Sequence, residues 1–316
     1  MELNSKIFIA GHKGLVGSAL VRKLKSAGYS NIIGKSIYEL DLSDKEAVNS
    51  FFENEKPEFV ILAAAKVGGI MANNKFPADF IFQNLEIQNN VINASYKNGV
   101  KKLLFLGSSC IYPKSSPQPI KEEYLLSGPL EPTNEPYAIA KIAGIKMCQS
   151  YNRQFKTNFI ACMPTNLYGP NDNFDLENSH VLPAMIRKFH EAKLRGDSNI
   201  TLWGDGTAMR EFLYVDDMAE ACIFMMNSYN PTAQENNDGS IFMNIGSGID
   251  ITIKELAETI KRIVGFDGEI KWDITKPNGT PRKLLDISKL NGLGWRYKVD
   301  LEEGIKRSYE WYLNNN

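Results

Sequence analysis

Short apolar runs alternate with longer amphipathic segments along the first half of the chain. The runs are apolar nearly throughout, which is typical of strands that are buried on both faces of a sheet. They cover residues 6–10, 31–33, 59–64, 102–107 and 159–164. The helical patterns between them cover residues 15–27, 45–53, 78–97 and 137–153. Because strands alternate with crossover helices, the pattern predicts an α/β fold with a doubly wound, Rossmann-type parallel sheet.

The pattern loosens after residue 164 and predicts a smaller C-terminal α/β domain. Helices are expected at 182–194 and at 252–264, where Gly265 stops the second one. Asp216 or Asp217 is expected to cap a third helix, and residues 231–239 are expected to form a polar loop. The domain boundaries that we predict are as follows: residues 1–168 plus about 213–245 form the Rossmann domain, and residues 169–212 plus 246–316 form the smaller one.

Composition excludes several classes of protein. The chain has 316 residues, 43% hydrophobic and 23% charged, and a formal net charge of −1, so it carries no electrostatic footprint for nucleic acid or an anionic membrane. Four cysteines lie scattered without a CxxC pair, which argues against a metal site and a disulfide framework. No cleavable apolar leader and no run of spanning length are present. We therefore expect a cytoplasmic protein that binds neither membrane nor nucleic acid.

A glycine-rich turn follows the first predicted strand. GHKGLVG places Gly11, Gly14 and Gly17 between that strand and an amphipathic helix. Glycines at this point allow a dinucleotide diphosphate to approach the backbone at the helix N-terminus. The spacing is GxxGxxG rather than GxGxxG, so a plain strand-to-helix turn remains the alternative.

The end of the second predicted strand bears on the choice of nicotinamide cofactor. An acidic residue there would bond the ribose diol of NAD, but the chain has Lys35 and Ser36, and the first acid is Glu39. Lys13 adds a second cation in the glycine turn. Two cations near a ribose 2′-phosphate favour NADP(H). The alternative is that both lysines are solvated on a surface loop.

A tyrosine, a lysine and a serine suggest carbonyl chemistry. Tyr137 and Lys141 are four residues apart and therefore share one face of a predicted helix. A tyrosine pKa near 10 must fall by roughly 3 units for acid–base work at neutral pH, and a nearby ammonium together with an oxidised nicotinamide supplies much of the stabilisation required. Ser108 ends the fourth strand, where it would donate a second hydrogen bond to the carbonyl oxygen.

Several longer motifs extend this pattern along nearly the whole chain. They are AAAKVGGIMANN, FLGSSCIYPK, EPTNEPYAIAKIAGIK, MPTNLYGPNDNF, NSHVLPA and GTPRKLLD. With them the chain resembles the extended short-chain dehydrogenase/reductase family, whose members act mostly on nucleotide sugars. The similarity is greatest to the branch that converts GDP-4-keto-6-deoxy-D-mannose to GDP-L-fucose. The resemblance implies epimerisation at C3 and C5, followed by reduction of C4 with NADPH.

The resemblance also implies a role for Cys110 and His180. A ketone at C4 acidifies the hydrogens on C3 and C5, so a base and an acid on opposite faces invert each centre. Cys110 matches the family's base and His180 its acid. The reference pKa of a thiol, about 8.5, leaves a useful thiolate fraction in an electropositive site. Ser108 and Tyr137 would stabilise first the enolate and then the alkoxide. The alternatives are an inert, buried Cys110 and a solvated His180.

Binding residues come with the same resemblance. Those implied for the cofactor NADPH/NADP⁺ are Gly11, Lys13, Gly14, Leu15, Val16, Gly17, Lys35, Tyr137, Lys141, Pro164, Asn166, Leu167 and His180. Those implied for the GDP-sugar substrate are Lys188, Trp203, Arg210 and Asn278. The alternative for Trp203 is a surface-anchoring core aromatic. Arg282 and Lys283 could add charge for the substrate or could equally be a solvated pair.

Two positions depart from the family pattern. The family pattern has a second arginine where this chain has Ile37, which weakens the expected preference for NADPH over NADH. The family pattern has an aspartate where this chain has Asn278.

Three other functions compete with this hypothesis. A 4-ketoreductase for a similar GDP-sugar would have no use for Cys110 and His180. A sugar dehydratase would carry an Asp-Glu pair after the strand-end hydroxyl, where this chain has Ser109 and Cys110. A non-catalytic NADP-binding sensor would be free to lose the catalytic residues. The family resemblance further implies a homodimer, formed through the long helices near 78–97 and 134–153.

Overall fold

A six-stranded parallel sheet forms the centre of the larger lobe. The structure is a computed structural model that describes residues 1–176, 179–276 and 278–315. The strand order is β2-β1-β3-β4-β5-β9, and each neighbouring pair is parallel. The strands are β1 (Ile7–Ala10), β2 (Ile32–Ile33), β3 (Phe59–Leu62), β4 (Lys102–Leu106), β5 (Phe159–Pro164) and β9 (Phe242–Ile245). This topology confirms the predicted doubly wound α/β fold.

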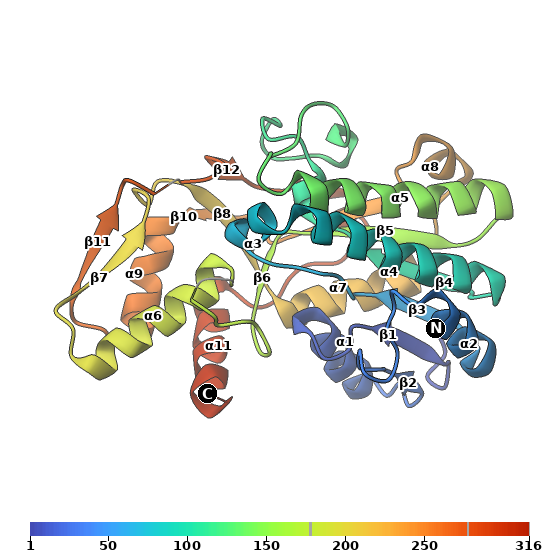
Figure 1. Ribbon diagram of the computed structural model, residues 1–316, viewed down its shortest axis with the longest axis horizontal. Coiled ribbons are helices and arrows are strands. Elements are labelled where there is room, and N and C mark those ends of the chain that lie inside the picture. The colour runs from blue at the N-terminus through green and yellow to red at the C-terminus, as the bar shows by residue number, and fades with distance from the viewer. Residues whose placement is uncertain (177–178, 277, 316) are drawn as a thin grey trace.

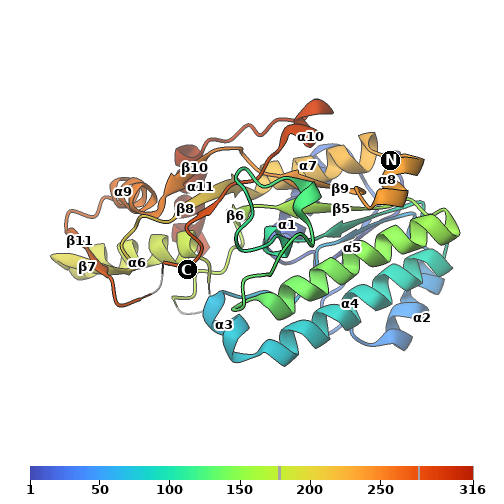
Figure 2. The same cartoon turned by 90° about the horizontal axis from the view of Figure 1, so that it is seen from above.

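Helices cover both faces of this sheet, as Figure 2 shows. On one face lie α2 (Lys45–Glu55), α4 (Pro77–Lys97) and α5 (Glu135–Phe155), and on the other lie α1 (Leu15–Ser26) and α7 (Val215–Ser228). Phe8, Phe52 and Ile145 belong to the first core, whereas Leu20 and Met225 belong to the second. Since both faces are covered, the strands need to be apolar throughout, as the sequence pattern indicated.

The second lobe is a smaller mixed assembly at the left of Figure 1. Its strands are β6 (Asn166–Tyr168), β7 (Asn199–Trp203), β8 (Met209–Tyr214), β10 (Asp250–Thr252), β11 (Glu269–Asp273) and β12 (Arg282–Lys283). β8 pairs with β6, β10 and β12, and β7 pairs with β11. The helices α6 (Val181–Arg195), α9 (Ile253–Val264) and α11 (Leu301–Asn315) pack around Phe189, Ile260 and Ile305. The second lobe thus has a core of its own.

Short elements complete the fold. They are α3 (Ile70–Lys75), α8 (Ala233–Asp238), α10 (Ser288–Gly292) and the 3₁₀ turns η1 (Ser109–Ile111) and η2 (Glu122–Tyr124). No helix among the described residues is long and apolar enough to span a bilayer.

Three local predictions can be compared with the structure. α9 ends at Gly265, which has a φ of 72°, as predicted. The predicted Asp cap of α7 is wrong, because Tyr214 is the N-cap. Asp217 instead accepts hydrogen bonds from the backbone N–H groups of Lys298 and Val299. The predicted loop at 231–239 contains α8, whose N-terminus is closed by a reciprocal pair of bonds between Thr232 and Glu235.

The C-terminal half returns to the first lobe twice. β9 and α7 join the parallel sheet and its helical layer, and Leu290 and Trp295 pack in the same core as α1 and α7. The domain boundaries given from the sequence, near residues 168, 213 and 245, remain a prediction.

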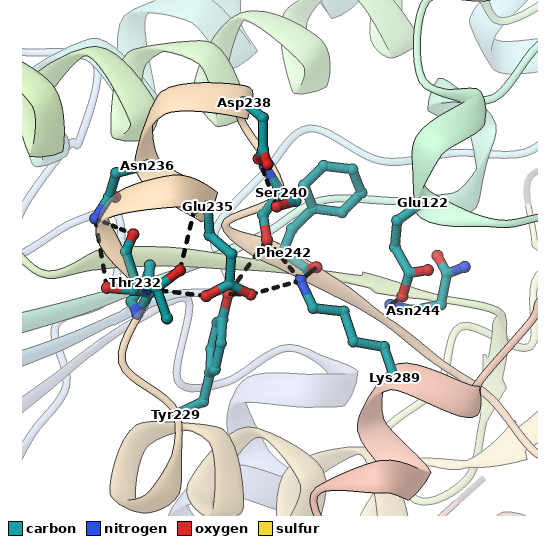
Figure 3. A network of polar contacts seen from close by, with 11 residues as sticks. Glu122, Tyr229, Thr232, Glu235, Asn236, Asp238, Ser240, Phe242, Asn244 and Lys289 are labelled. Atoms are coloured by element: carbon teal, nitrogen blue, oxygen red, sulfur yellow. Dashed lines mark hydrogen bonds and ion pairs between the residues drawn. The ribbon is translucent and has the colours of Figure 1, made fainter.

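A polar network secures the second of these returns (Figure 3). Lys289 on α10 donates hydrogen bonds to the carbonyls of Ser240 (2.6 Å) and Phe242 (3.2 Å) and pairs with Glu235. Glu235 also accepts a hydrogen bond from the Tyr229 hydroxyl. The network therefore joins α8, α10 and the start of β9 on the side of the molecule away from the helices of the second lobe.

A buried carboxylate joins the two lobes. Glu211 on β8 is fully buried, and its side chain accepts hydrogen bonds from the N–H groups of Gly248 (2.7 Å) and Leu285 (3.0 Å). Its backbone carbonyl accepts one from the Thr165 hydroxyl, just past β5. Burial raises the pKa of this carboxyl, and the two N–H donors counteract the rise. Glu211 thus ties β8 to three chain segments.

Gly246 tests how rigid this junction is. An added Cβ would lie 2.1 Å from the Oε1 of Glu211, an atom that is already held by its N–H donor. We expect Gly246→Ala to lower the free energy of unfolding by about 1–3 kcal/mol, as overpacking does elsewhere. Urea unfolding measures this change. The control is Gly292→Ala, where the added Cβ meets open space; equal losses in both variants would contradict the account.

Candidate active site

One large cavity opens at the carboxyl edge of the parallel sheet and extends to the second lobe. Its volume is about 1170 Å³, enough for a dinucleotide and a nucleotide sugar together. Every site residue predicted from the sequence lines it: Gly11, Lys13, Gly14, Leu15, Val16, Gly17, Lys35, Ser108, Cys110, Tyr137, Lys141, Pro164, Asn166, Leu167, His180, Lys188, Trp203, Arg210 and Asn278. Their proximity follows from topology, because parallel strands end at one edge.

The glycine turn leaves room for a ligand because its backbone is closely packed. Gly11 has a φ of 85°, which favours glycine, and an added Cβ would lie 2.8 Å from the backbone of Ala64. A Cβ on Gly17 would lie 2.0 Å from the carbonyl oxygen of Gly11. Gly14 is the N-cap of α1 and has no side chain to occupy the helix end. The free N–H groups of this helix end are suited to a diphosphate.

Lys13 and Lys35 lie at the end of the cavity that the turn forms. The pKa of the nearby Glu39 carboxyl is lowered chiefly by hydrogen bonds from the hydroxyl and the N–H of Ser36 (2.6 and 2.8 Å). The charges of Lys35 and Lys13 lower it further. The two cations therefore lie in the same corner of the cavity. The Glu39 carboxylate is within their range as well, so the charge in this corner is partly balanced.

Lys141 is directed at the end of β4 and at Tyr137. Its Nζ donates a hydrogen bond to the Leu106 carbonyl (2.8 Å) and lies 5.7 Å from the centre of the Tyr137 ring. The side chain is only 3% exposed, and this burial lowers the pKa of its ammonium to about 8. The ammonium therefore sits beside the phenol at neutral pH.

The side-chain hydroxyl groups of Tyr137 and Ser108 lie within hydrogen-bonding reach of each other. Burial raises the pKa of the Tyr137 phenol, the neighbouring Cys110 raises it further, and the Ser108 hydroxyl lowers it. The phenol is thus protonated at neutral pH, and it is set to donate rather than to accept a proton. Lowering its pKa requires the charge of a bound ligand.

Cys110 is held in the 3₁₀ turn η1 directly after β4. The Ser108 Oγ accepts a hydrogen bond from the Cys110 N–H (3.3 Å), and Cys110 is 7% exposed. Burial raises the pKa of its thiol, and Lys283 and Lys141 counteract that rise. Burial therefore disfavours the predicted thiolate, although two cations face it.

His180 is the N-cap of α6. Its ring is exposed to the open cavity, yet protein surrounds the position, and desolvation followed by the charge of Lys283 lowers the pKa of the imidazole. A ligand bound in the cavity would cover the exposed ring and so complete this desolvation. Asn178 of the NSH motif lies outside the described residues.

The second lobe contributes the predicted sugar-nucleotide end. Lys188 donates to the Thr201 carbonyl (3.1 Å), and Arg210 donates to the carbonyl of Met209 (2.8 Å). Trp203 is 55% exposed in the cavity wall, which argues against a role as a core aromatic. Asn278 accepts a hydrogen bond from the Asp205 N–H (2.9 Å), so it holds the turn after Trp203.

The sequence did not single out some residues that line the same cavity. Asp41, Leu42 and Lys66 follow β2 and β3, and the rule of strand ends would have found Lys66. Asn134 precedes α5, and its buried Oδ1 has no hydrogen-bond partner among the described residues. Lys283, which the sequence left open, lines the cavity beside Cys110.

The remaining cysteines take no part in the cavity. Cys148, Cys162 and Cys222 are buried and unpaired, as predicted for core residues. Within the described ranges no group of three or more His, Cys, Asp or Glu side chains is placed to hold a metal ion.

Known proteins are similar to this chain over most of its length. The model of the NAD dependent epimerase/dehydratase family matches residues 7–246. The chain is 60% identical over 314 residues to GDP-L-fucose synthase 1 of Arabidopsis thaliana, which covers 99% of this chain and 95% of the relative. It is 54% identical over 311 residues to GDP-L-fucose synthase of Escherichia coli (strain K12), at 98% and 97% coverage.

A solved structure is similar over the same length. It is a GDP-mannoheptose C4 reductase from Campylobacter jejuni with NADP bound, with a TM-score of 0.90 and 45% identity over 99% of both chains.

Lys141 gives a prediction that separates stability from activity. A lysine whose pKa falls from 10.5 to about 8 costs the folded state about 3 kcal/mol below pH 8. Loss of its bond to the Leu106 carbonyl would offset about 1–2 kcal/mol of that. We expect Lys141→Met to be more stable by about 1–2 kcal/mol at pH 7, yet to lose carbonyl reduction.

The sign of the pH dependence follows from the lowered pKa. The cost of the buried ammonium is present in full below pH 8 and disappears as the pH rises towards 10.5. Urea unfolding at pH 7 and pH 10 should therefore show a gain for Lys141→Met that shrinks at the higher pH. A variant less stable than the unsubstituted protein at pH 7 would disprove this account.

Proposed function

The chain belongs to the NAD dependent epimerase/dehydratase family, and we propose that within it the protein is a GDP-L-fucose synthase. It converts GDP-4-keto-6-deoxy-D-mannose to GDP-L-fucose by epimerising C3 and C5 and then reducing C4 with NADPH. The observation that carries this proposal is the full-length similarity to GDP-L-fucose synthases, at 54–60% identity, combined with one cavity that brings Ser108, Cys110, Tyr137, Lys141 and His180 together.

The residues around the glycine turn fit a phosphorylated dinucleotide. The close backbone at Gly11 and Gly17 excludes a Cβ and leaves the N-terminus of α1 to the diphosphate. Lys13 and Lys35 would hold the 2′-phosphate, and Pro164, Asn166 and Leu167 would line the nicotinamide end. The comparison structure with NADP bound supports this choice. When bound, NADPH supplies the hydride for C4.

The GDP-sugar is held by the second lobe. Lys188 and Arg210 place cations along the path of the diphosphate, and the exposed Trp203 offers a face for the base or a sugar. Asn278 acts by keeping the turn after Trp203 in place, since its amide is bonded to Asp205. The domain boundaries predicted from the sequence are part of this proposal.

Epimerisation uses the acidity that the C4 ketone gives to its neighbours. Cys110 takes a proton from the carbon, the electron pair moves onto the C4 oxygen as an enolate, and Ser108 and Tyr137 donate hydrogen bonds to that oxygen. His180 then delivers a proton to the opposite face as the carbonyl re-forms. The same sequence at the other carbon completes the inversion of both centres.

Reduction uses the same oxygen site. As hydride reaches C4, negative charge returns to the oxygen that Ser108 and Tyr137 hold. Tyr137 gives its proton to that oxygen, and the Lys141 ammonium, 5.7 Å from the ring centre, stabilises the phenolate that remains. One oxyanion site thus serves both reactions.

The alternative is a GDP-sugar 4-reductase that does not epimerise, as the name of the Campylobacter jejuni relative describes. Such an enzyme needs Ser108, Tyr137 and Lys141 only. The placement of Cys110 and His180 in the same cavity favours the bifunctional enzyme.

Isotope exchange tests the proposed function. We expect incubation with GDP-4-keto-6-deoxy-D-mannose and NADPH in D₂O to give a fucosyl product with deuterium at C3 and C5, detected by NMR. Cys110→Ala should lose the exchange by about 10²-fold or more, the usual contribution of a general base. It should keep NADPH binding, since the thiol lies at the sugar end. NADPH consumption by the unsubstituted enzyme with hydrogen retained at both carbons would identify a plain reductase.

We also propose a cytoplasmic homodimer. Four unpaired cysteines suit a reducing compartment. Phe82 on α4 and Ile139 and Phe155 on α5 are exposed by 60%, 40% and 38% and offer an apolar surface for a second copy. We expect size-exclusion chromatography with light scattering to give a dimer, and Phe82→Glu with Ile139→Glu to give a monomer. A monomeric unsubstituted protein would refute the dimer.

A further inference from the structure

Two successive epimerisations place a requirement on the base and the acid, if the proposed function holds. After the first inversion, Cys110 carries the proton it removed and His180 has lost the one it delivered. Neither can act again until Cys110 loses a proton and His180 gains one. With substrate in the large cavity the thiol has little contact with bulk water on that side, since Cys110 is only 7% exposed. The site therefore needs a group that takes the proton from the thiol.

A small polar pocket lies behind Cys110. Its volume is about 50 Å³, which holds at least one water molecule. The small pocket and the large cavity share Cys110, Asn134 and Lys283 as lining residues. Glu131 lines the small pocket but not the large cavity. Lys283 thus lies near the thiol and near a space for water outside the large cavity.

Lys283 is the unpaired member of a set of charges. Its neighbour Arg282 pairs with Asp250 (2.6 Å), and Glu131 pairs with Lys114 (2.9 Å). Across residues 1–176, 179–276 and 278–315, the Nζ of Lys283 has neither an ion pair nor a hydrogen bond. An ammonium without a partner adds no ion pair to the fold, so these contacts give no structural reason for this lysine.

The position of Lys283 is fixed by backbone pairing. β12 pairs with β8 in a register that puts Lys283 opposite Arg210. The next residues are held at both sides, because Leu284 N–H donates to the Gln118 side chain (2.8 Å) and Leu285 N–H donates to Glu211 (3.0 Å). The side chain therefore starts from a rigid strand.

The charges that face Cys110 and Lys283 act on each in a consistent direction. Burial raises the pKa of the thiol and lowers that of the ammonium, so each group alone favours its neutral form. The charge of each group favours the charged form of the other. The charge of Lys141 favours the thiolate of Cys110. The charge of Arg210 disfavours the ammonium of Lys283, and that of Glu131 favours it. The charge of Lys283 in turn lowers the pKa of His180.

We propose that Lys283 is the proton acceptor that resets Cys110 between the two epimerisations. In its amine form, Lys283 takes the proton from the thiol through a water molecule in the small pocket, since its Nζ makes no direct hydrogen bond to the sulfur. The S–H bond breaks, the water passes a proton on, an N–H bond forms, and a thiolate–ammonium pair results. The thiolate then removes the proton from the substrate carbon. With the thiol neutral again, the ammonium loses its attraction and releases its proton to water in the small pocket, which returns the amine.

This cycle adds no reactant and no net charge. One proton leaves through the pocket for each proton taken from carbon, and His180 regains one from the solvent of the large cavity. Lys283 acts on the substrate only through Cys110.

Lys283→Met tests the proposal, with Lys271→Met on exposed β11 as the matched control. Methionine keeps the length of the side chain and removes a group that has no ion pair or hydrogen bond within the described residues, so the variant is expected to fold and to bind NADPH. We expect deuterium exchange at C3 and C5 at pH 7 to fall by about 10²-fold, in the range of general acid–base catalysis. Without the cation the thiol ionises at higher pH, so the rise of exchange with pH should shift upward by about one unit.

Rescue distinguishes a chemical role from a structural one. Lys283→Ala leaves space beside the small pocket, and added methylamine should restore exchange in proportion to its neutral form. The inference is overturned if Lys283→Met exchanges like Lys271→Met, if its exchange falls equally at every pH, or if methylamine fails to rescue Lys283→Ala. Absence of exchange in the unsubstituted enzyme would refute the proposed function instead.

Discussion

The carboxylate of Glu211, buried where the two lobes meet, is the interaction on which the arrangement of the cavity depends. Its side chain holds the N–H groups of Gly248 and Leu285, and its backbone carbonyl accepts from Thr165. Because these bonds converge on one residue of β8, they fix the neighbouring Arg210 and the strand that carries Lys283 against the carboxyl edge of the parallel sheet. The cavity has two rigid walls as a result.

Between these walls, burial shifts the pKa of each reactive group towards its neutral form. It raises the pKa of Cys110 and Tyr137 and lowers that of Lys141 and His180. Negative charge on the thiol or the phenol therefore develops only where a neighbouring cation, the substrate or a bound nicotinamide stabilises it. The cations facing Cys110 then decide whether the thiol can act as a base, which is why Lys283 matters to the proposed chemistry.

Much of this could be predicted from the sequence, because local patterns determine it. The apolar strands, the turn from Gly11 to Gly17 and the spacing of Tyr137 and Lys141 each follow from short stretches of chain, and parallel topology brings their ends together. The small helix α8 was missed, because Thr232 and Glu235 form a cap that is not followed by an apolar run. Lys283 could not be interpreted, since its burial depends on a two-residue strand and on Glu211.

The central claim is that one oxyanion site, built by Ser108 and Tyr137, serves both epimerisation and reduction. The most direct measurement compares two rates in a single variant, Ser108→Ala: deuterium exchange at C3 and C5, and NADPH oxidation. Loss of one such donor is expected to slow each by about 10²–10³-fold, and the account predicts that both rates fall by a similar factor. Exchange at the unsubstituted rate alongside a large loss of reduction would contradict it.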